Sequence, residues 1–165
     1  MFTVGILIAS DKASDGKRQD QSGMVITEII NNLGWKVVSY LVVADDTVQI
    51  KSALLSMCDN QKINLVLTSG GTGFGPRDNT PEATKAVIER EVPGIPEIMR
   101  WESMKKTPRA MLSRAVAGIR KQTLIINLPG SPKAVRECLE VVLPALTHGL
   151  EILNGQSGEC GSKLV

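Results

Sequence analysis

A glycine-rich segment that contains a carboxylate is the first feature of the sequence that could do chemistry. Residues 69–82 read Ser-Gly-Gly-Thr-Gly-Phe-Gly-Pro-Arg-Asp-Asn-Thr-Pro-Glu and follow a short apolar run. Glycines permit positive φ and let a ligand approach the backbone closely. Thr80 suits the N-cap of a helix and Pro81 its first position, and a helix N-terminus favours phosphate. Asp78 adds the oxygen ligand that hard cations prefer. We expect a metal ion at Asp78 and a phosphate site built from Ser69, Gly70, Gly71, Thr72, Gly73, Thr80 and Pro81.

Two common phosphate-binding templates do not fit this segment. A dinucleotide fingerprint that starts at Gly71 needs glycine at position 76, which is Pro76, and the Gly-Lys-Ser/Thr of a Walker loop does not occur. A tight structural turn would also explain glycine richness without any ligand. The segment therefore needs support from other parts of the chain.

A second turn has the same kinds of residue as the first, namely a glycine, a hydroxyl that can cap a helix and a proline. Residues 127–132 read Asn-Leu-Pro-Gly-Ser-Pro, follow another apolar run, and precede the cation Lys133. Ser131 suits an N-cap and Pro132 the first helical position. A well-capped helix without a ligand is the alternative. With the first turn, this one predicts a two-walled phosphate cleft whose second wall is formed by Asn127, Pro129, Gly130, Ser131 and Pro132.

Two further apolar runs end in acids or hydroxyls. Ser10-Asp11 follows the run that ends at Ala9, and Asp45-Asp46 follows Val43-Ala44. Helix caps or solvated loop acids are the alternative for each pair taken alone. Open α/β sheets bind ligands at the carboxyl ends of their strands, however, and all four runs end in such residues. We expect Ser10, Asp11 and Asp45 to belong to the same site.

The elements that must position these residues alternate along the chain. Apolar runs predict strands over residues 4–9, 36–43, 65–67, 112–119 and 123–128. Helical periodicity predicts helices over 22–33, 47–58 with Thr47 as cap, 80–90, 94–105 and 131–153, with Pro144 as a break or kink. This alternation predicts a three-layer α/β/α sandwich with a mostly parallel, mixed sheet, in which the last two strands form an antiparallel hairpin. We expect one domain over residues 1–154 and a flexible tail over 155–165.

Composition excludes several classes of function. The 165 residues carry a net charge of +2 and only 3% aromatic residues, which argues against a nucleic-acid partner. No apolar run approaches the roughly 18 residues of a membrane span, and the apolar N-terminus lacks a preceding basic segment. We therefore expect a cytoplasmic protein without a membrane partner. Cys58, Cys138 and Cys160 form no CxxC pair, which argues against structural zinc.

At these motifs the sequence resembles the molybdenum-cofactor biosynthesis family, especially the molybdopterin adenylyltransferases and the G domain of gephyrin. The resemblance runs from Val4 to about Leu153, nearly the whole chain. Its matching stretches are Ser69-Gly-Gly-Thr-Gly73, Pro76-Arg-Asp-Asn-Thr-Pro-Glu-Ala-Thr84, Glu91-Val-Pro-Gly94, Ala117-Gly-Ile-Arg120 and Ile125-Ile-Asn-Leu-Pro-Gly-Ser-Pro132.

The resemblance implies a reaction and a site. In it, the phosphate of molybdopterin attacks the α-phosphorus of ATP with Mg²⁺, giving adenylylated molybdopterin and pyrophosphate. The family's catalytic, metal-binding aspartates map onto Asp78 and Asp45; Asp46 stays open as the second acid, because Ala44 stands where the family usually has proline. The resemblance also implies a homotrimer and a molybdate-insertion protein as a partner.

Other functions remain as alternatives at this point. A non-catalytic pterin-binding or molybdate-insertion relative would share the fold, although molybdate-insertion domains normally sit in longer, multidomain chains. An assembly scaffold or a generic nucleotide-binding domain is a further interpretation. For residues 94–105, which include Trp101, a subunit interface and ordinary core packing are equally open.

Overall fold

The computed structural model describes residues 1–17 and 19–155, which build a six-stranded sheet. In the order of the sheet the strands are β2 (Lys36–Val43), β1 (Thr3–Ala9), β3 (Leu65–Ser69), β6 (Thr123–Leu128), β5 (Ala117–Arg120) and β4 (Arg90–Glu91). The first four are parallel, whereas β5 runs antiparallel to both of its neighbours. The predicted mixed sheet with a terminal hairpin is confirmed.

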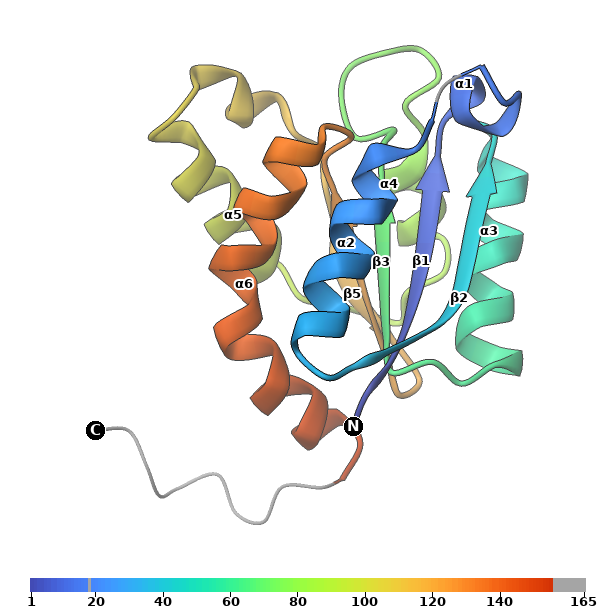
Figure 1. Ribbon diagram of the computed structural model, residues 1–165, viewed down its shortest axis with the longest axis vertical. Coiled ribbons are helices and arrows are strands. Elements are labelled where there is room, and N and C mark those ends of the chain that lie inside the picture. Colours follow the sequence, from blue (N-terminus) through green and yellow to red (C-terminus); the bar gives the residue numbers. More distant parts are fainter. Residues whose placement is uncertain (18, 156–165) are drawn as a thin grey trace.

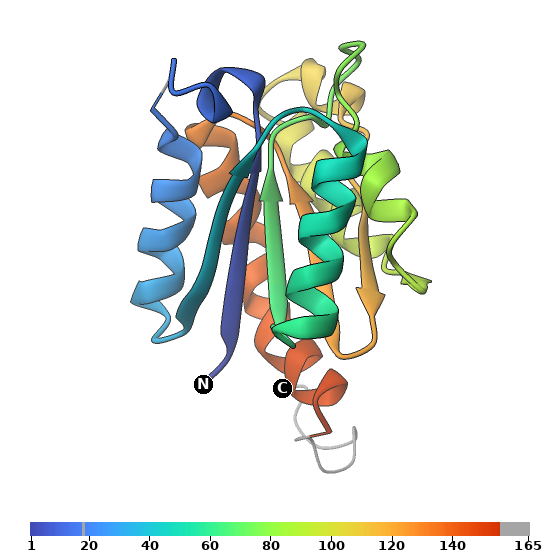
Figure 2. The same ribbon diagram turned by 90° about the vertical axis from the view of Figure 1, so that its right-hand side faces the viewer.

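Helices cover both faces of this sheet. On one face lie α2 (Gln21–Asn32), α5 (Gly94–Met104) and α6 (Pro132–Leu153), and on the other lie α3 (Thr47–Leu55) and α4 (Thr80–Lys85). Figures 1 and 2 show the three layers, with the sheet between α2 and α3. Shorter turns are α1 (Asp11–Ser14), a π-helical turn over Ser56–Asn60 and a 3-10 helix over Pro108–Leu112.

The buried sequence of the central strands explains this arrangement. Every residue of β3 and β6 is buried, and β1 is buried from Val4 onward. Strands that are apolar on both faces need cover on both faces. One apolar core therefore lies under α2, α5 and α6, around Ile6, Ile26 and Leu139, and a second lies under α3 and α4, around Leu7 and Leu54.

Two predicted elements were wrong in extent. The strand expected over 112–119 covers only Ala117–Arg120, because the preceding amides of Arg114 and Val116 donate to the Thr72 carbonyl and to Asn127 Oδ1 instead of a strand neighbour. The helix expected over 80–90 ends at Lys85, and the chain turns so that Glu89 N donates to the Ile119 carbonyl at 2.8 Å. That pairing creates the edge strand β4, which the sequence did not indicate.

Of the predicted helix caps, one is confirmed and two are wrong. Ser131 caps α6 as predicted, since its Oγ accepts a hydrogen bond from Ala134 N at 3.2 Å. Asp46, not Thr47, caps α3, and Asn79, not Thr80, occupies the N-cap position of α4. Of the break or kink expected at Pro144, the break is wrong, since α6 continues through this exposed position to Leu153.

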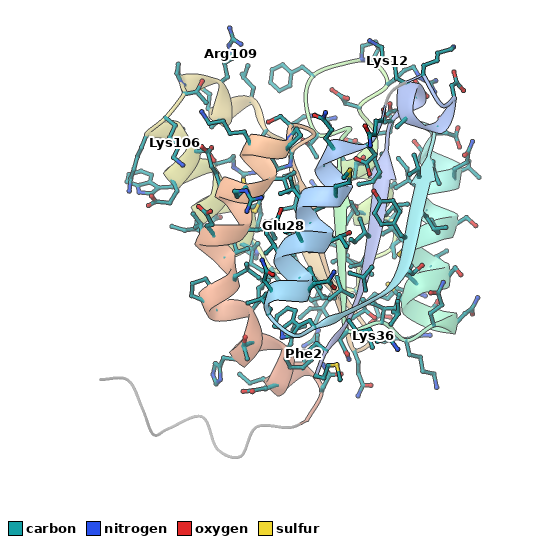
Figure 3. All side chains as sticks on the ribbon, in the orientation of Figure 1. Phe2, Lys12, Glu28, Lys36, Lys106 and Arg109 are labelled. Atoms are coloured by element: carbon teal, nitrogen blue, oxygen red, sulfur yellow. The ribbon has the colours of Figure 1, made fainter. Side chains whose placement is uncertain are left out.

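The described part of the chain ends at Gly155, two residues after α6. Of the tail expected over 155–165, residues 156–165 lie outside the described part of the chain. Among the helices that are described, none combines the length and apolarity that a membrane span requires. Figure 3 shows Lys12 and Arg109 at one end of the sheet, where β1 and β2 finish, and Phe2 and Lys36 at the opposite end.

Candidate functional site

The ends of four parallel strands define the candidate site. The register places Ala9 beside Val43, Ile8 beside Ser69, and Ser69 beside Leu128, so the residues that follow these positions meet at one sheet edge. The chain runs outward from β1 to β2 and then returns to the other side of β1 for β3. This reversal of strand order is where open α/β sheets bind ligands.

The two predicted glycine turns touch each other at this edge. Ser69 Oγ donates to the Pro129 carbonyl at 2.8 Å, and Gly70 N donates to the Leu128 carbonyl at 3.3 Å. Gly70 has φ +95°, and a Cβ there would stand 2.3 Å from the Ala9 carbonyl oxygen. Only glycine fits this contact with β1. The amide of Gly70 is therefore engaged inside the protein.

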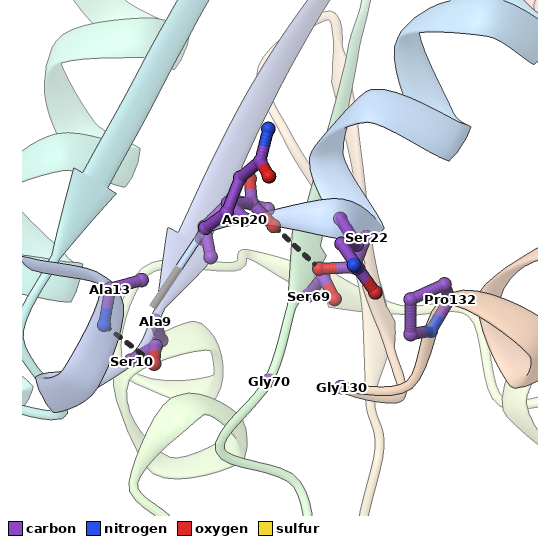
Figure 4. A pocket seen from close by; sticks show the side chains of 12 residues that line it. Ala9, Ser10, Ala13, Asp20, Ser22, Ser69, Gly70, Gly130 and Pro132 are labelled. Carbon is purple, nitrogen blue, oxygen red and sulfur yellow. Dashed lines mark hydrogen bonds between the residues drawn. The ribbon is translucent and has the colours of Figure 1, made fainter. Parts of the chain in front are cut away.

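A cavity of about 150 Å³ opens beside these turns (Figure 4). Its lining combines predicted site residues with residues that the sequence did not single out: Ile8, Ala9, Ser10, Ala13, Gln19, Asp20, Gln21, Ser22, Ser69, Gly70, Gly130 and Pro132. Asp20 caps α2, accepting from Gly23 N at 3.0 Å and from Ser22 Oγ at 2.8 Å. Its other carboxylate oxygen accepts from the Tyr40 hydroxyl. Of the missed residues, Ile8, Ala9 and Ala13 come from β1 and α1, and residues 19–22 lie at the start of α2, whose sequence signal was that of an ordinary helix start.

Asp11 and Asp45 form a reciprocal pair across the ends of β1 and β2. Asp45 Oδ2 accepts from Asp11 N at 2.9 Å, and Asp11 Oδ1 accepts from Asp45 N at 3.0 Å. The Arg77 guanidinium donates two further hydrogen bonds to the Asp11 carboxylate, from Nε at 2.6 Å and from Nη2 at 2.8 Å. The Arg77 hydrogen bond lowers the pKa of Asp11 below its usual value. Asp11 is thus held ionised by a residue to which the sequence analysis assigned no role.

Asp45 has the opposite electrostatic environment. Burial raises the pKa of Asp45, and the nearby carboxylates of Asp11 and Asp78 raise it further. Its Oδ1 atom is buried without a hydrogen-bond partner. An unpaired, desolvated carboxylate oxygen beside other acids is unfavourable unless a cation or a donor joins it. Asp45 therefore has the chemistry of an incomplete cation site.

Asp78 is half-buried and lies near the end of the glycine loop, which comprises residues 70–79. Its Oδ2 accepts from Gly75 N at 2.8 Å, so the carboxylate folds back over the loop. A Cβ at Gly73 or Gly75 would stand 2.9 Å from the same oxygen. Because Asp78 also acts electrostatically on Asp45, the two predicted aspartates share one edge of the subunit.

Gly71 brings a second unpartnered oxygen toward Asp45. Thr80 Oγ1 is buried without a hydrogen-bond partner, and it lies 2.4 Å from the point where a Gly71 Cβ would stand. Asp45 Oδ1 lies 3.2 Å from that point. Since Gly71 has φ +65°, both its conformation and its neighbours require glycine. The prediction of Thr80 as an N-cap was wrong, but its hydroxyl faces the same corner as Asp45.

The remaining predicted residues differ in their access to a ligand. Thr72 and Pro81 are buried, whereas Gly130 and Ser131 are exposed. Asn127 is fully buried: its Nδ2 donates to Thr68 Oγ1 at 3.0 Å and Thr84 Oγ1 at 2.9 Å, and its Oδ1 accepts from Val116 N. Its side chain thus holds β3, α4 and the segment before β5 together beneath the cleft.

Arg114 is a heavily engaged residue that the sequence analysis missed. Its Nε donates to the Gly73 carbonyl at 2.7 Å, its Nη2 donates to the Asp78 carbonyl at 2.6 Å, and its Nη1 pairs with Glu82. No local spacing signals this role, because the contacts span 32 to 41 residues.

The donor set suits a cation that also binds the substrate. Among residues 1–17 and 19–155, no group of three or more His, Cys, Asp or Glu side chains is arranged to hold a metal ion. Mg²⁺ is commonly bound by one or two carboxylates together with waters and substrate phosphates. The unpartnered Oδ1 of Asp45, with Asp78 nearby, fits that pattern.

Fold, site and sequence similarity together define the class of protein. Residues 5–148 match the model of the molybdenum-cofactor biosynthesis family that is described as a probable molybdopterin binding domain. The chain belongs to this family.

Individual proteins and a solved structure are similar to most of this chain. The chain is 46% identical over 162 residues to the molybdopterin adenylyltransferase of Helicobacter pylori strain J99, covering 97% of this chain and 92% of that protein. It is 44% identical to gephyrin of Dictyostelium discoideum, of which it covers 23%. Among solved structures, the molybdopterin biosynthesis enzyme MoaB of Thermus thermophilus superposes with a TM-score of 0.90 at 49% identity, covering 96% of this chain and all of that one.

Proposed function

We propose that this protein adenylylates molybdopterin with ATP in molybdenum cofactor biosynthesis. Several relatives at 40–46% identity bear the name molybdopterin adenylyltransferase. The single observation that carries the proposal is the unpartnered, desolvated carboxylate oxygen of Asp45 at the strand-order reversal, with Asp78 close enough to perturb it. Two acids that face an anionic substrate make chemical sense when a cation lies between them and the phosphates.

The proposed reaction transfers AMP without a nucleophile from the protein. A phosphate oxygen of molybdopterin forms a bond to the α-phosphorus of ATP, and the bond from that phosphorus to the oxygen bridging it to the β-phosphorus breaks. Pyrophosphate leaves with the electron pair. A phosphate monoester is already largely ionised near neutral pH, so the protein must mainly align the reactants and offset their charge.

The residues of the site divide this work. Asp45 and Asp78 would hold Mg²⁺, which supplies charge neutralisation on the phosphates when it is bound. The backbone of Gly71–Gly73 would approach one phosphate, while Gly70 holds the turn against β1. The start of α6, with Ser131 and Lys133, forms the opposite wall and presents a long helix N-terminus to anions. The six-residue α4 contributes less of this effect.

The proposal also includes the oligomeric state, the protein partner and the cellular compartment. The proposed homotrimer needs a subunit interface, which is supported by exposed apolar side chains along α5 and the following 3-10 helix, where Trp101 is 63% and Met111 is 58% exposed. Core packing as the role of Trp101 is thereby disfavoured. The reaction uses ATP and delivers a product to molybdate insertion, so we expect cytoplasmic action and a molybdate-insertion protein as the next partner.

The decisive experiment measures pyrophosphate and adenylylated pterin from purified protein, ATP, Mg²⁺ and molybdopterin. The wild-type protein should release the two products in equal amounts and stop when Mg²⁺ is chelated. Asp78→Asn should lower turnover at least about 100-fold, because it removes the charge while keeping an acceptor for Gly75 N.

Asp46→Asn is the matched control. Asp46 neighbours Asp45, but its Oδ1 accepts from Gln49 N at 2.9 Å as the cap of α3, a role that asparagine retains. Turnover within about twofold of wild type is expected. Loss of activity in Asp46→Asn with normal activity in Asp45→Asn would reassign the second acid. Pterin binding by the wild type without any pyrophosphate would instead support a non-catalytic or molybdate-insertion relative.

A further inference from the structure

The side chain of Arg114 lies against the glycine loop and contacts it at two separate carbonyls. Nε donates to Gly73 O at 2.7 Å and Nη2 donates to Asp78 O at 2.6 Å, while the backbone N–H of the same residue donates to Thr72 O at 2.9 Å. One residue of a distant segment therefore secures both the beginning and the end of the loop.

The planar guanidinium makes these contacts interdependent. Its donors form a rigid fork, so two carbonyls that bind the same guanidinium are held at a fixed separation. Glu82, at the start of α4, pairs with Nη1 and orients the fork. Burial alone would raise the pKa of Glu82, but the Arg114 hydrogen bond, a backbone hydrogen bond and the charges of Arg114 and Lys85 together outweigh it, so the pKa is lowered and this carboxylate stays ionised.

The carboxylate of Asp78 depends on this fixation. Its hydrogen-bond partner is the amide of Gly75, a residue of the exposed loop itself. Phe74, next to it, is 71% exposed and packs too little to hold the loop. Because catalytic geometry is sensitive to displacements of about 1 Å, a loop that moves would remove Asp78 from its working position.

We propose that Arg114 is a positioning residue of the adenylyl-transfer site, which holds Asp78 opposite Asp45 by clamping the Gly73 and Asp78 carbonyls. The inference rests on the proposed function for its consequence on turnover, but the clamp itself is a property of the free protein. The side chain of Arg114 binds two loop carbonyls and Glu82 rather than the carboxylates of Asp45 and Asp78, so we expect its effect on turnover to pass through the loop.

The test compares Arg114→Met with Arg120→Met. Arg120 also binds a carbonyl, Val87 O at 3.0 Å, and a carboxylate, Asp59 at 2.7 Å, but it closes the hairpin at the opposite end of the sheet. Both substitutions remove a guanidinium with the same kinds of contact and keep an unbranched stem. General loss of stability should therefore appear in both variants, and loss of positioning only in Arg114→Met.

Hydrogen–deuterium exchange of the free protein is the first readout. Amides of residues 72–79 should exchange at least about tenfold faster in Arg114→Met and at the wild-type rate in Arg120→Met. Unchanged exchange of this loop in Arg114→Met overturns the clamp, whether or not the protein proves to be an adenylyltransferase.

Steady-state kinetics are the second readout. In Arg114→Met we expect kcat to fall about 100-fold and the half-saturating Mg²⁺ concentration to rise, whereas Arg120→Met stays within about twofold of wild type. Adding Arg114→Met to Asp78→Asn should cost less than about threefold more, because both act through one carboxylate. Fully multiplicative losses would show that Arg114 acts elsewhere.

Arg114→Lys keeps the proposal testable if Arg114→Met fails to fold. It keeps the charge and most of the stem but lacks the fork, so faster loop exchange and at least about a tenfold loss of kcat are expected. Wild-type exchange and turnover with lysine would reduce the role of Arg114 to its charge and refute the proposal. If the wild type releases no pyrophosphate, the proposed function fails, and with it the role of Arg114 in positioning.

Discussion

Replacing Asp45 by asparagine is expected to make the ligand-free protein more stable while it removes turnover. Burial and two neighbouring carboxylates raise the pKa of Asp45, and its Oδ1 has no hydrogen-bond partner. In Asp45→Asn, the carbonyl oxygen still accepts from Asp11 N, while the new amide group faces the corner where Thr80 Oγ1 also lacks a partner. One substitution therefore removes a like charge and supplies a donor to a buried acceptor.

The size of the gain follows from these two changes. A buried acceptor without a partner costs about 1–3 kcal/mol, but solvent screens a carboxylate that is only partly buried. A net gain of about 1 kcal/mol corresponds to a rise in Tm of about 2–4 °C for a domain of this size. Turnover should fall at least about 100-fold, because the cation site loses a charged ligand.

The gain should depend on pH with a definite sign. A carboxyl whose pKa is raised by folding favours the protonated native state, so ionisation destabilises the fold as pH rises from the unfolded value of about 3.9 to the folded one. Asp45→Asn should therefore exceed wild type most at pH 7, and the difference should shrink as pH falls toward 4. Urea unfolding at pH 4, 5.5 and 7 measures this difference directly.

Asp59→Asn is the control of opposite sign. Hydrogen bonds from Arg120 and Lys121 lower the pKa of Asp59 to about 2, so its ionised form stabilises the fold above the unfolded pKa and loses that effect as pH falls. Asp59→Asn should thus be less stable than wild type at pH 7. The reasoning is refuted if Asp45→Asn is the less stable protein at pH 7, or if its gain is the same at all three pH values.

Three further substitutions, with Gly34→Ala as a control for the first, test the parts of the fold that hold the site. Gly70→Ala should cost about 3 kcal/mol or more in urea unfolding, because a Cβ would meet the Ala9 carbonyl at 2.3 Å, whereas Gly34→Ala, with similar positive φ and open space, should cost only about 1–2 kcal/mol; equal losses would contradict this. Asn127→Ala should cost about 3 kcal/mol by calorimetry, since it leaves a buried amide and two hydroxyls without partners. Ser131→Ala should cost about 1 kcal/mol by loss of the α6 cap, and no change in stability would remove that role.

The strands around the candidate site and one helix cap could be predicted from local sequence patterns. The runs over residues 4–9, 36–43, 65–67 and 123–128 were predicted as strands from their apolar residues, and the strands end at Ala9, Val43, Ser69 and Leu128, the third two residues later than predicted. Parallel pairing then brings their ends to one edge, so the sheet edge of the candidate site could be predicted from the sequence. The capping role of Ser131 followed as well, since it depends only on the next three residues.

Elements whose hydrogen bonds come from distant segments were predicted incorrectly. The segment before Ala117 has the composition of a strand, yet Val116 N donates to Asn127 Oδ1 and Arg114 N donates to Thr72 O. The strand β4 exists because its backbone pairs with β5, although the residues of β4 itself are charged. No window of neighbouring residues contains these partners.

The sequence by itself indicated the layered fold, the sheet edge of the candidate site and the family, because each rests on apolar periodicity or on contiguous motifs, and it left the second acid open between Asp45 and Asp46. Only the tertiary structure decided that Asp45 pairs with Asp11, that its second oxygen shares a corner with Thr80, and that Arg114 clamps the glycine loop. These contacts join residues 34 to 41 positions apart. Their energies come from burial and charge that exist only when the strands have already met.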